Sequence, residues 1–85
     1  MDDWRRRIER LGFRPTEYGG MRGTFEGISI TATQHPLKGL CLSGNYFNGQ
    51  KASDVELFIP VDSGRRSMAR AVLEIHRLVY PNSMQ

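Results

Sequence analysis

Arginine is the residue type in this chain with the clearest chemical potential, because its planar guanidinium binds carboxylates and phosphates through paired hydrogen bonds. Eight of the ten arginines fall in two short segments near the ends of the chain. These are Arg5, Arg6, Arg7, Arg10, Arg65, Arg66, Arg70 and Arg77. The middle of the chain, residues 15–62, is slightly acidic, with three basic residues against five acidic ones. This distribution predicts a basic surface for an anionic or acidic partner.

The start of the second arginine-rich segment is a candidate anion site. Arg65 and Arg66 would lie in the first turn of a helix, where the helix dipole disfavours each cation by roughly 0.3–1 kcal/mol. Free backbone N–H groups and two guanidiniums would together hold a phosphate or a carboxylate. The alternative, which we favour because surface charges are loosely placed, is that Asp62 pairs with these arginines.

Other reactive side chains are few. Cys41 is the single cysteine, and His35 and His76 are the two histidines. Their spacing matches no metal-binding pattern, and a Cys–His catalytic pair would lack a third residue to orient it. The glycines at positions 19, 20, 23 and 27 lack the Lys-Ser/Thr ending of a phosphate loop. We therefore expect no enzyme activity, no metal and no cofactor.

Length and composition are typical of one small globular domain, residues 1–85, with 39% hydrophobic and 25% charged residues. No stretch approaches the roughly 20 apolar residues of a membrane span, so no membrane association is expected. The charged N-terminus, with no apolar run behind it, does not resemble a signal peptide. A lone cysteine cannot form an internal disulfide, and we therefore expect a cytoplasmic location.

Two helices are expected to position the arginines. The first, residues 2–11, carries Trp4, Ile8 and Leu11 at i, i+4 and i+7, a spacing that places them on one stripe. Either aspartate at its start can cap it, and Gly12 is a natural stop.

The second helix begins after Asp62-Ser63, either of which can cap it, and ends at Pro81. Its apolar face is expected to comprise Met68, Ala71, Val72, Ile75, Leu78 and Val79. The opposite face carries Arg66, Arg70, Glu74 and Arg77.

The middle of the chain alternates as an antiparallel sheet does when one of its faces is covered. Three inward rows are expected, namely Ile28/Ile30/Ala32, Leu40/Leu42 and Val55/Leu57/Ile59/Val61. The alternation slips at Gly27, which indicates a turn at Glu26-Gly27 or a β-bulge, and we favour the turn. A second turn is expected at His35-Pro36, and a loop from Asn48 to Ser53.

The outward positions of these strands are polar except for two aromatic residues. Phe58 is expected on the open sheet face, with Phe47 beside it if the register holds. There they would form a stacking platform or an interface anchor, unless a loop or the C-terminal tail covers them.

The resulting fold class is α+β: a helix, an antiparallel meander of three to four strands, and a second helix. Both helices are expected on one sheet face, as a two-layer sandwich. The expected core comprises Trp4, Ile8, Leu11, Phe25, Ile28, Ile30, Leu40, Leu42, Val55, Leu57, Ile59, Val72, Ile75 and Val79.

The order of the expected elements has a parallel in a known family. The helix–three-strand–helix order, with the stretch Ser63 to Ala71 opening the last helix, resembles double-stranded-RNA-binding domains. The resemblance implies that Arg65 and Arg66 contact phosphates. The Lys-rich signature and the Gly-Pro-x-His loop of that family are absent.

A net charge of +3 with only two lysines is low for nucleic-acid binding, whereas arginine without lysine is typical of protein interfaces. We therefore expect a small non-catalytic protein-binding module, an adaptor, regulator or inhibitor, that docks on an acidic protein. Nucleic-acid binding and homodimerisation through sheet edges are the alternatives. The candidate partner-binding residues are Arg5, Arg6, Arg10, Arg65, Arg66, Arg70, Arg77 and Phe58.

Overall fold

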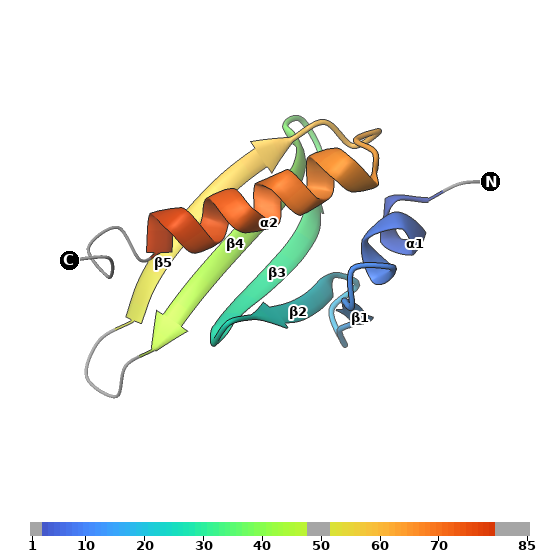
Figure 1. The fold of residues 1–85 in the computed structure, drawn as a ribbon. Helices are drawn as coiled ribbons and strands as arrows, with labels where there is room; N and C mark the ends of the chain where they lie inside the picture. The colour runs from blue at the N-terminus through green and yellow to red at the C-terminus, as the bar shows by residue number, and fades with distance from the viewer. Residues whose placement is uncertain (1–2, 48–51, 80–85) are drawn as a thin grey trace.

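The computed structural model describes residues 3–47 and 52–79, with the side chains of residues 3–44 and 55–79. Its elements are α1 (Trp4–Glu9), β1 (Arg14–Pro15), β2 (Met21–Phe25), β3 (Ile28–His35), β4 (Gly39–Phe47), β5 (Ala52–Ile59) and α2 (Arg65–Val79). The strands form one antiparallel sheet in the order β1-β2-β3-β4-β5 (Figure 1). The α+β class is confirmed, but the sheet has five strands where three to four were predicted.

The additional strand is β1, which is too short to show an alternating pattern in the sequence. Its two residues pair with Arg22 and Met21 of β2. Phe13, just before β1, is buried, and its ring covers Gly23 of β2 so closely that a Cβ there would lie 2.8 Å from a ring carbon. The strand is therefore formed by tertiary packing and not by a local pattern.

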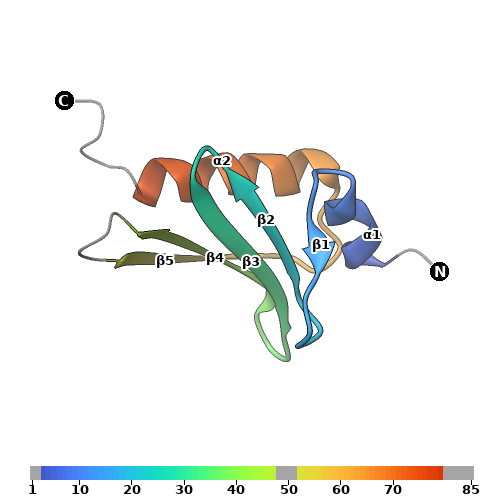
Figure 2. The ribbon, with the colours of Figure 1, turned by 90° about the horizontal axis from the view of Figure 1, so that it is seen from below.

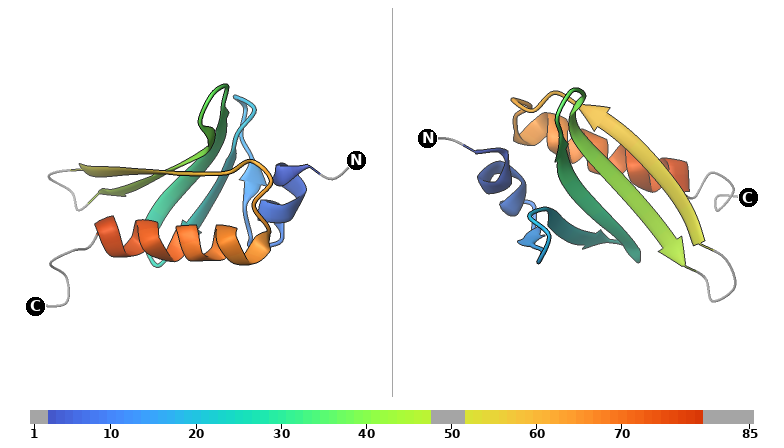
Figure 3. Two further views of the ribbon diagram at one scale, coloured as in Figure 1. Left: turned by 90° about the horizontal axis from the view of Figure 1, so that it is seen from above. Right: turned by 180° about the vertical axis from the view of Figure 1, so that it is seen from behind.

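The two helices have different relations to the sheet. α2 packs on β4 and β5 and touches β3, whereas α1 touches β2 and α2. Figures 2 and 3 show α1 at the end of the sheet next to β1, close to the start of α2. α2 therefore covers mainly the β4–β5 side of the sheet, whereas the predicted sandwich had both helices covering the sheet.

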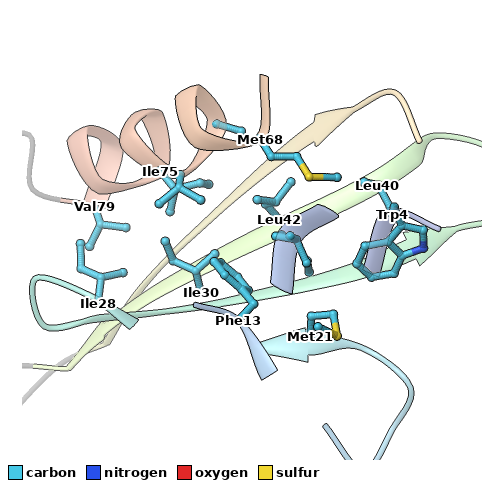
Figure 4. Packing of buried hydrophobic residues seen from close by; sticks show 14 residues of the cluster. Trp4, Phe13, Met21, Ile28, Ile30, Leu40, Leu42, Met68, Ile75 and Val79 are labelled. Atoms are coloured by element: carbon cyan, nitrogen blue, oxygen red, sulfur yellow. The ribbon is translucent and has the colours of Figure 1, made fainter. Parts of the chain in front are cut away.

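The apolar side chains of both helices and of β2 to β4 nevertheless form one buried cluster (Figure 4). Its members are Trp4, Ile8, Phe13, Met21, Ile28, Ile30, Ala32, Leu40, Leu42, Met68, Ala71, Val72, Ile75 and Val79. Phe25, Val55, Leu57 and Ile59 are half-buried against it. The indole N–H of Trp4 donates to the side-chain oxygen of Gln34 at 3.2 Å, which ties α1 to β3.

Three residues that were predicted to face inward are exposed: Leu11, Val61 and Leu78. Leu11 and Val61 are exposed because they follow the ends of their elements: α1 ends at Glu9 and β5 ends at Ile59, so the periodic pattern of each element stops before them. Phe13 and Met21 are buried although the predicted core omitted them.

The turns follow the predictions where the structure describes them. Glu26 and Gly27 have φ of 49° and 85°, the two positive values of a two-residue hairpin turn, so the turn and not the bulge is correct. The second turn occupies residues 36–38, because β3 includes His35, so only Pro36 of the predicted pair lies in it. Ser53 belongs to β5, which makes the preceding loop shorter than predicted. Residues 48–51 of that loop and the predicted helix stop at Pro81 lie outside the described residues.

The close approach of α2 to the sheet depends on one glycine. Gly44 is buried in β4, and a Cβ at this position would overlap the Cγ2 atom of Ile75. A glycine here therefore sets the distance between α2 and β4.

Candidate functional site

The outer face of α2 carries a straight row of side chains. Residues at i, i+4, i+7 and i+11 lie on one face of a helix. On α2 this row, which we call the arginine stripe, consists of Arg66, Arg70, Leu73 and Arg77, all of them exposed. The buried residues of α2 lie on the side of the helix that faces the sheet; they are Met68, Ala71, Val72, Ile75 and Val79.

The arginines of the stripe differ in how they are paired. Arg66 and Arg70 form no ion pair with any residue that the structure describes. Arg77 instead donates to both carboxylate oxygens of Glu74, at 3.0 and 2.9 Å. These hydrogen bonds, together with the charge of Glu74, raise the pKa of the Arg77 guanidinium. Two guanidiniums of the stripe are therefore available to an external carboxylate.

The first turn of α2 is positively charged and contains no acidic residue. Arg65 and Arg66 are exposed, and within the described chain Asp62 forms no ion pair with either of them. The neutralising contact that we favoured from the sequence is therefore not formed. The Ser63 hydroxyl donates to the Pro60 carbonyl at 2.6 Å, which makes it part of the preceding turn.

Arg5 is engaged in contacts within the fold. Its guanidinium lies 3.4 Å from the Asp3 carboxylate and 4.7 Å from the centre of the Trp4 ring. Its Nε and Nη2 both donate to the Gly19 carbonyl, at 3.3 and 3.2 Å. Arg5 thus holds the loop between β1 and β2 against α1.

Arg7 fastens α1 to the segment that precedes α2. Its Nε donates to the Ser63 carbonyl and its Nη2 to the Val61 carbonyl, both at 2.8 Å. The guanidiniums of Arg6 and Arg10, by contrast, are exposed and form no ion pair with the part of the chain that the structure describes. Of the four arginines in and directly after α1, two therefore serve the fold and two remain accessible.

Phe58 is 39% exposed, as its outward position predicted. The His35 ring meets it edge-on with 5.9 Å between ring centres, and Lys38 Nζ lies 5.0 Å from its centre. Since its neighbours in β5 pack against the core beneath α2, Phe58 lies on the opposite sheet face from the arginine stripe. The predicted partner-binding residues are thus divided between two faces of the molecule. The side chain of Phe47, which was predicted beside Phe58, lies outside the described residues.

Cys41 pairs with Phe58 in the β4–β5 register and is half-buried on the open face. Its Sγ lies 3.8 Å from Oε2 of Glu56. Desolvation, followed by the charge and the hydrogen bond of Glu56, raises the pKa of the Cys41 thiol. A raised thiol pKa opposes the formation of a nucleophilic thiolate.

Both histidines have structural contacts. His35 Nδ1 accepts two backbone N–H groups of the following turn, each at 3.0 Å. His76 Nε2 lies 3.0 Å from the Glu26 carboxylate, and its ring meets Phe25 edge-on with 5.2 Å between centres. Through these contacts His76 connects α2 to the turn between β2 and β3. Among the described residues, no group of three or more His, Cys, Asp or Glu side chains is placed to hold a metal.

An apolar groove opens beside the arginine stripe. It has a volume of about 260 Å³ and lies between β2, α2 and the chain that follows α1. Its lining residues are Leu11, Phe13, Thr24, Phe25, Ala69, Val72 and Leu73. Leu11 is 37% exposed and Leu73 is 55% exposed, so the rim of this groove is apolar surface in contact with solvent.

The groove was not predicted from the sequence. A signal for one side of it was present, because Leu73 falls among arginines on the polar face of the second helix. The other side had no signal, because Leu11 and Phe13 follow the end of α1 and belong to no periodic pattern.

A second hollow, of about 390 Å³, lies at the β1 edge of the sheet. Arg14 and Arg22 are direct cross-strand partners there. Like charges in direct cross-strand register repel each other. Glu17 and Tyr18 complete the rim, and Tyr18 is almost fully exposed. These arginines were not among the predicted site residues, because β1 was not predicted.

In the described part of the chain, neither helix is long and apolar enough to cross a membrane. Comparison of the chain with protein-family models, with curated proteins and with solved structures finds no match.

Proposed function

We propose that this chain is a small non-catalytic protein-binding module that docks the arginine stripe of α2 on an acidic surface of a partner protein. The observation that carries the proposal is the combination of Arg66 and Arg70, exposed and without an ion pair in the described chain, with the exposed Leu73 between Arg70 and Arg77. Guanidinium forks bind carboxylates in a defined geometry, and arginine is enriched in protein interfaces where lysine is depleted.

The leucine favours a protein over a nucleic acid as the partner. Binding to a phosphate backbone gains free energy when cations of the protein displace counterions from it. A leucine in the arginine stripe contributes nothing to that gain. A protein interface, by contrast, combines an apolar centre with a polar rim. Arg77 adds an intramolecular contact, its pair with Glu74, which orients this part of the stripe.

The test is recovery of the partner from a nuclease-treated extract of the native cell. We expect the wild-type chain to retain a stoichiometric acidic protein, and the double variant Arg66→Glu/Arg70→Glu to release it. The matched control is Arg6→Glu/Arg10→Glu, which makes the same charge change at two exposed positions, one in α1 and one directly after it.

Two results would overturn the proposal. One is loss of the bound partner on nuclease treatment alone, which would indicate that a nucleic acid is the ligand. The other is equal retention of the partner by the stripe variant and by the wild type.

A further inference from the structure

We infer that the groove beside the arginine stripe binds one or two large apolar side chains of an acidic peptide segment, so that groove and stripe act as one two-part site. The inference rests on the proposed function and specifies the chemistry of its partner: a segment in which large apolar residues are flanked by Asp or Glu.

The size of the groove determines the kind of occupant. Pockets for small-molecule ligands and cofactors typically measure about 300–1,000 Å³. The groove, at about 260 Å³, is below that range and is open to solvent along its rim. It suits the insertion of side chains from a larger partner better than the enclosure of a separate molecule.

The lining of the groove determines the chemistry of the inserted group. Six of its seven lining residues are apolar, Thr24 is the single polar one, and none is charged. A charged side chain would lose its hydration here without gaining a partner, whereas an apolar side chain would remove the exposed surface of Leu11 and Leu73 from water.

Leu73 connects the groove to the stripe, because it belongs to both. A segment that seats a side chain against Leu73 and continues along the groove past Ala69 passes next to Arg70 and Arg66. Carboxylates flanking the apolar residue would meet these guanidiniums. A second copy of this chain would instead bring two arginine stripes together, and their repulsion disfavours that occupant.

The experiment uses a random peptide library displayed on phage and selected against the full chain. Selected peptides are then synthesised, and their affinities for variants are measured by fluorescence anisotropy. Leu73→Gln removes the shared apolar contact. Leu78→Gln is the matched control, an exposed leucine on the same helix that does not line the groove.

We expect the selected peptides to combine a large apolar residue with acidic neighbours. Leu73→Gln should weaken their binding about tenfold or more, as truncation of a buried interface anchor does, and Leu78→Gln should have little effect. Replacement of the apolar residue of the peptide by Ala should produce a similar loss.

The other outcomes separate the two proposals. Acidic peptides that bind through Arg66 and Arg70 but are insensitive to Leu73→Gln would overturn the inference about the groove and leave the proposed function standing. Failure to enrich any peptide, or binding that survives Arg66→Glu/Arg70→Glu, would count against both.

Discussion

Replacement of Arg7 by Ala tests whether an arginine that looks like surface charge in the sequence stabilises the fold. Two donors of its guanidinium each lie 2.8 Å from a backbone carbonyl, one at Ser63 and one at Val61. A hydrogen bond from a charged group contributes roughly 1.5–3 kcal/mol when it is well protected. Since Arg7 is half-buried and its contact with Val61 is exposed, we discount the sum for solvent screening to about 2 kcal/mol.

The assay is urea unfolding followed by circular dichroism, with a thermal scan beside it. In a domain of this size, a loss of about 2 kcal/mol lowers Tm by roughly 8–16 °C. Arg6→Ala is the matched control, because Arg6 has the same charge and lies on the same short helix but is exposed. It should change the free energy of unfolding by no more than about 0.5 kcal/mol.

Arg7→Lys separates charge from geometry. The lysine ammonium keeps the positive charge but lacks the planar fork that reaches two carbonyls, so an intermediate loss of stability is expected. If the free energies of unfolding of Arg7→Ala and Arg6→Ala differ by less than about 0.5 kcal/mol, the conclusion that Arg7 holds α1 in place is refuted.

Three further predictions concern the core, the thiol and acid stability. Gly44→Ala should lower the free energy of unfolding in urea by about 1–3 kcal/mol, because the added methyl overlaps Ile75. Because the pKa of Cys41 is raised, iodoacetamide at mildly alkaline pH should alkylate it more slowly in the folded chain than in urea, and Glu56→Gln should speed the folded-state reaction. The Asp3 carboxylate accepts the Arg5 N–H, which lowers its pKa; the stability it contributes is therefore present above its unfolded pKa and is lost as the pH falls through the folded value. Asp3→Asn should accordingly make the free energy of unfolding fall less steeply as the pH is lowered.

Each of these predictions has a control and a contradicting result. Ser43→Ala, at the neighbouring position on the open face, should be nearly neutral, and an equally neutral Gly44→Ala would refute close packing under α2. Equal alkylation rates in the folded chain and in urea would refute the protection of Cys41. Asp62→Asn makes the same replacement at a carboxylate that forms no ion pair in the described chain. If Asp3→Asn leaves the pH dependence of stability in acid unchanged, this cap does not contribute.

The parts of the fold that were predicted correctly are those with a long local pattern. α2 has a face of apolar residues repeated over about three turns, and five of the six predicted to face inward are buried. The alternation of Ile28, Ile30 and Ala32 gave the inward face of β3, and the slip at Gly27 located a hairpin turn. These patterns are readable because helix and strand geometry repeats at fixed periods.

The parts of the site that were missed have no such period. The arginines of the stripe could be predicted to share one face of the second helix, because they repeat along it, whereas Leu73 was not placed on that face. The groove required Leu11 and Phe13, which follow α1, to lie beside a helix more than fifty residues later in the chain. The roles of Arg5 and Arg7 depended in the same way on which loops lie within reach of their guanidiniums.

The α+β class, the inward face of each long element and the row of arginines on α2 could be predicted without coordinates, because each follows from a local period. Three features required the folded structure: α1 closes the end of the core, Arg5 and Arg7 are used within the fold, and Phe58 lies on the opposite face from the stripe. Those facts depend on contacts between residues distant in the chain, and such contacts are set by how the elements pack together.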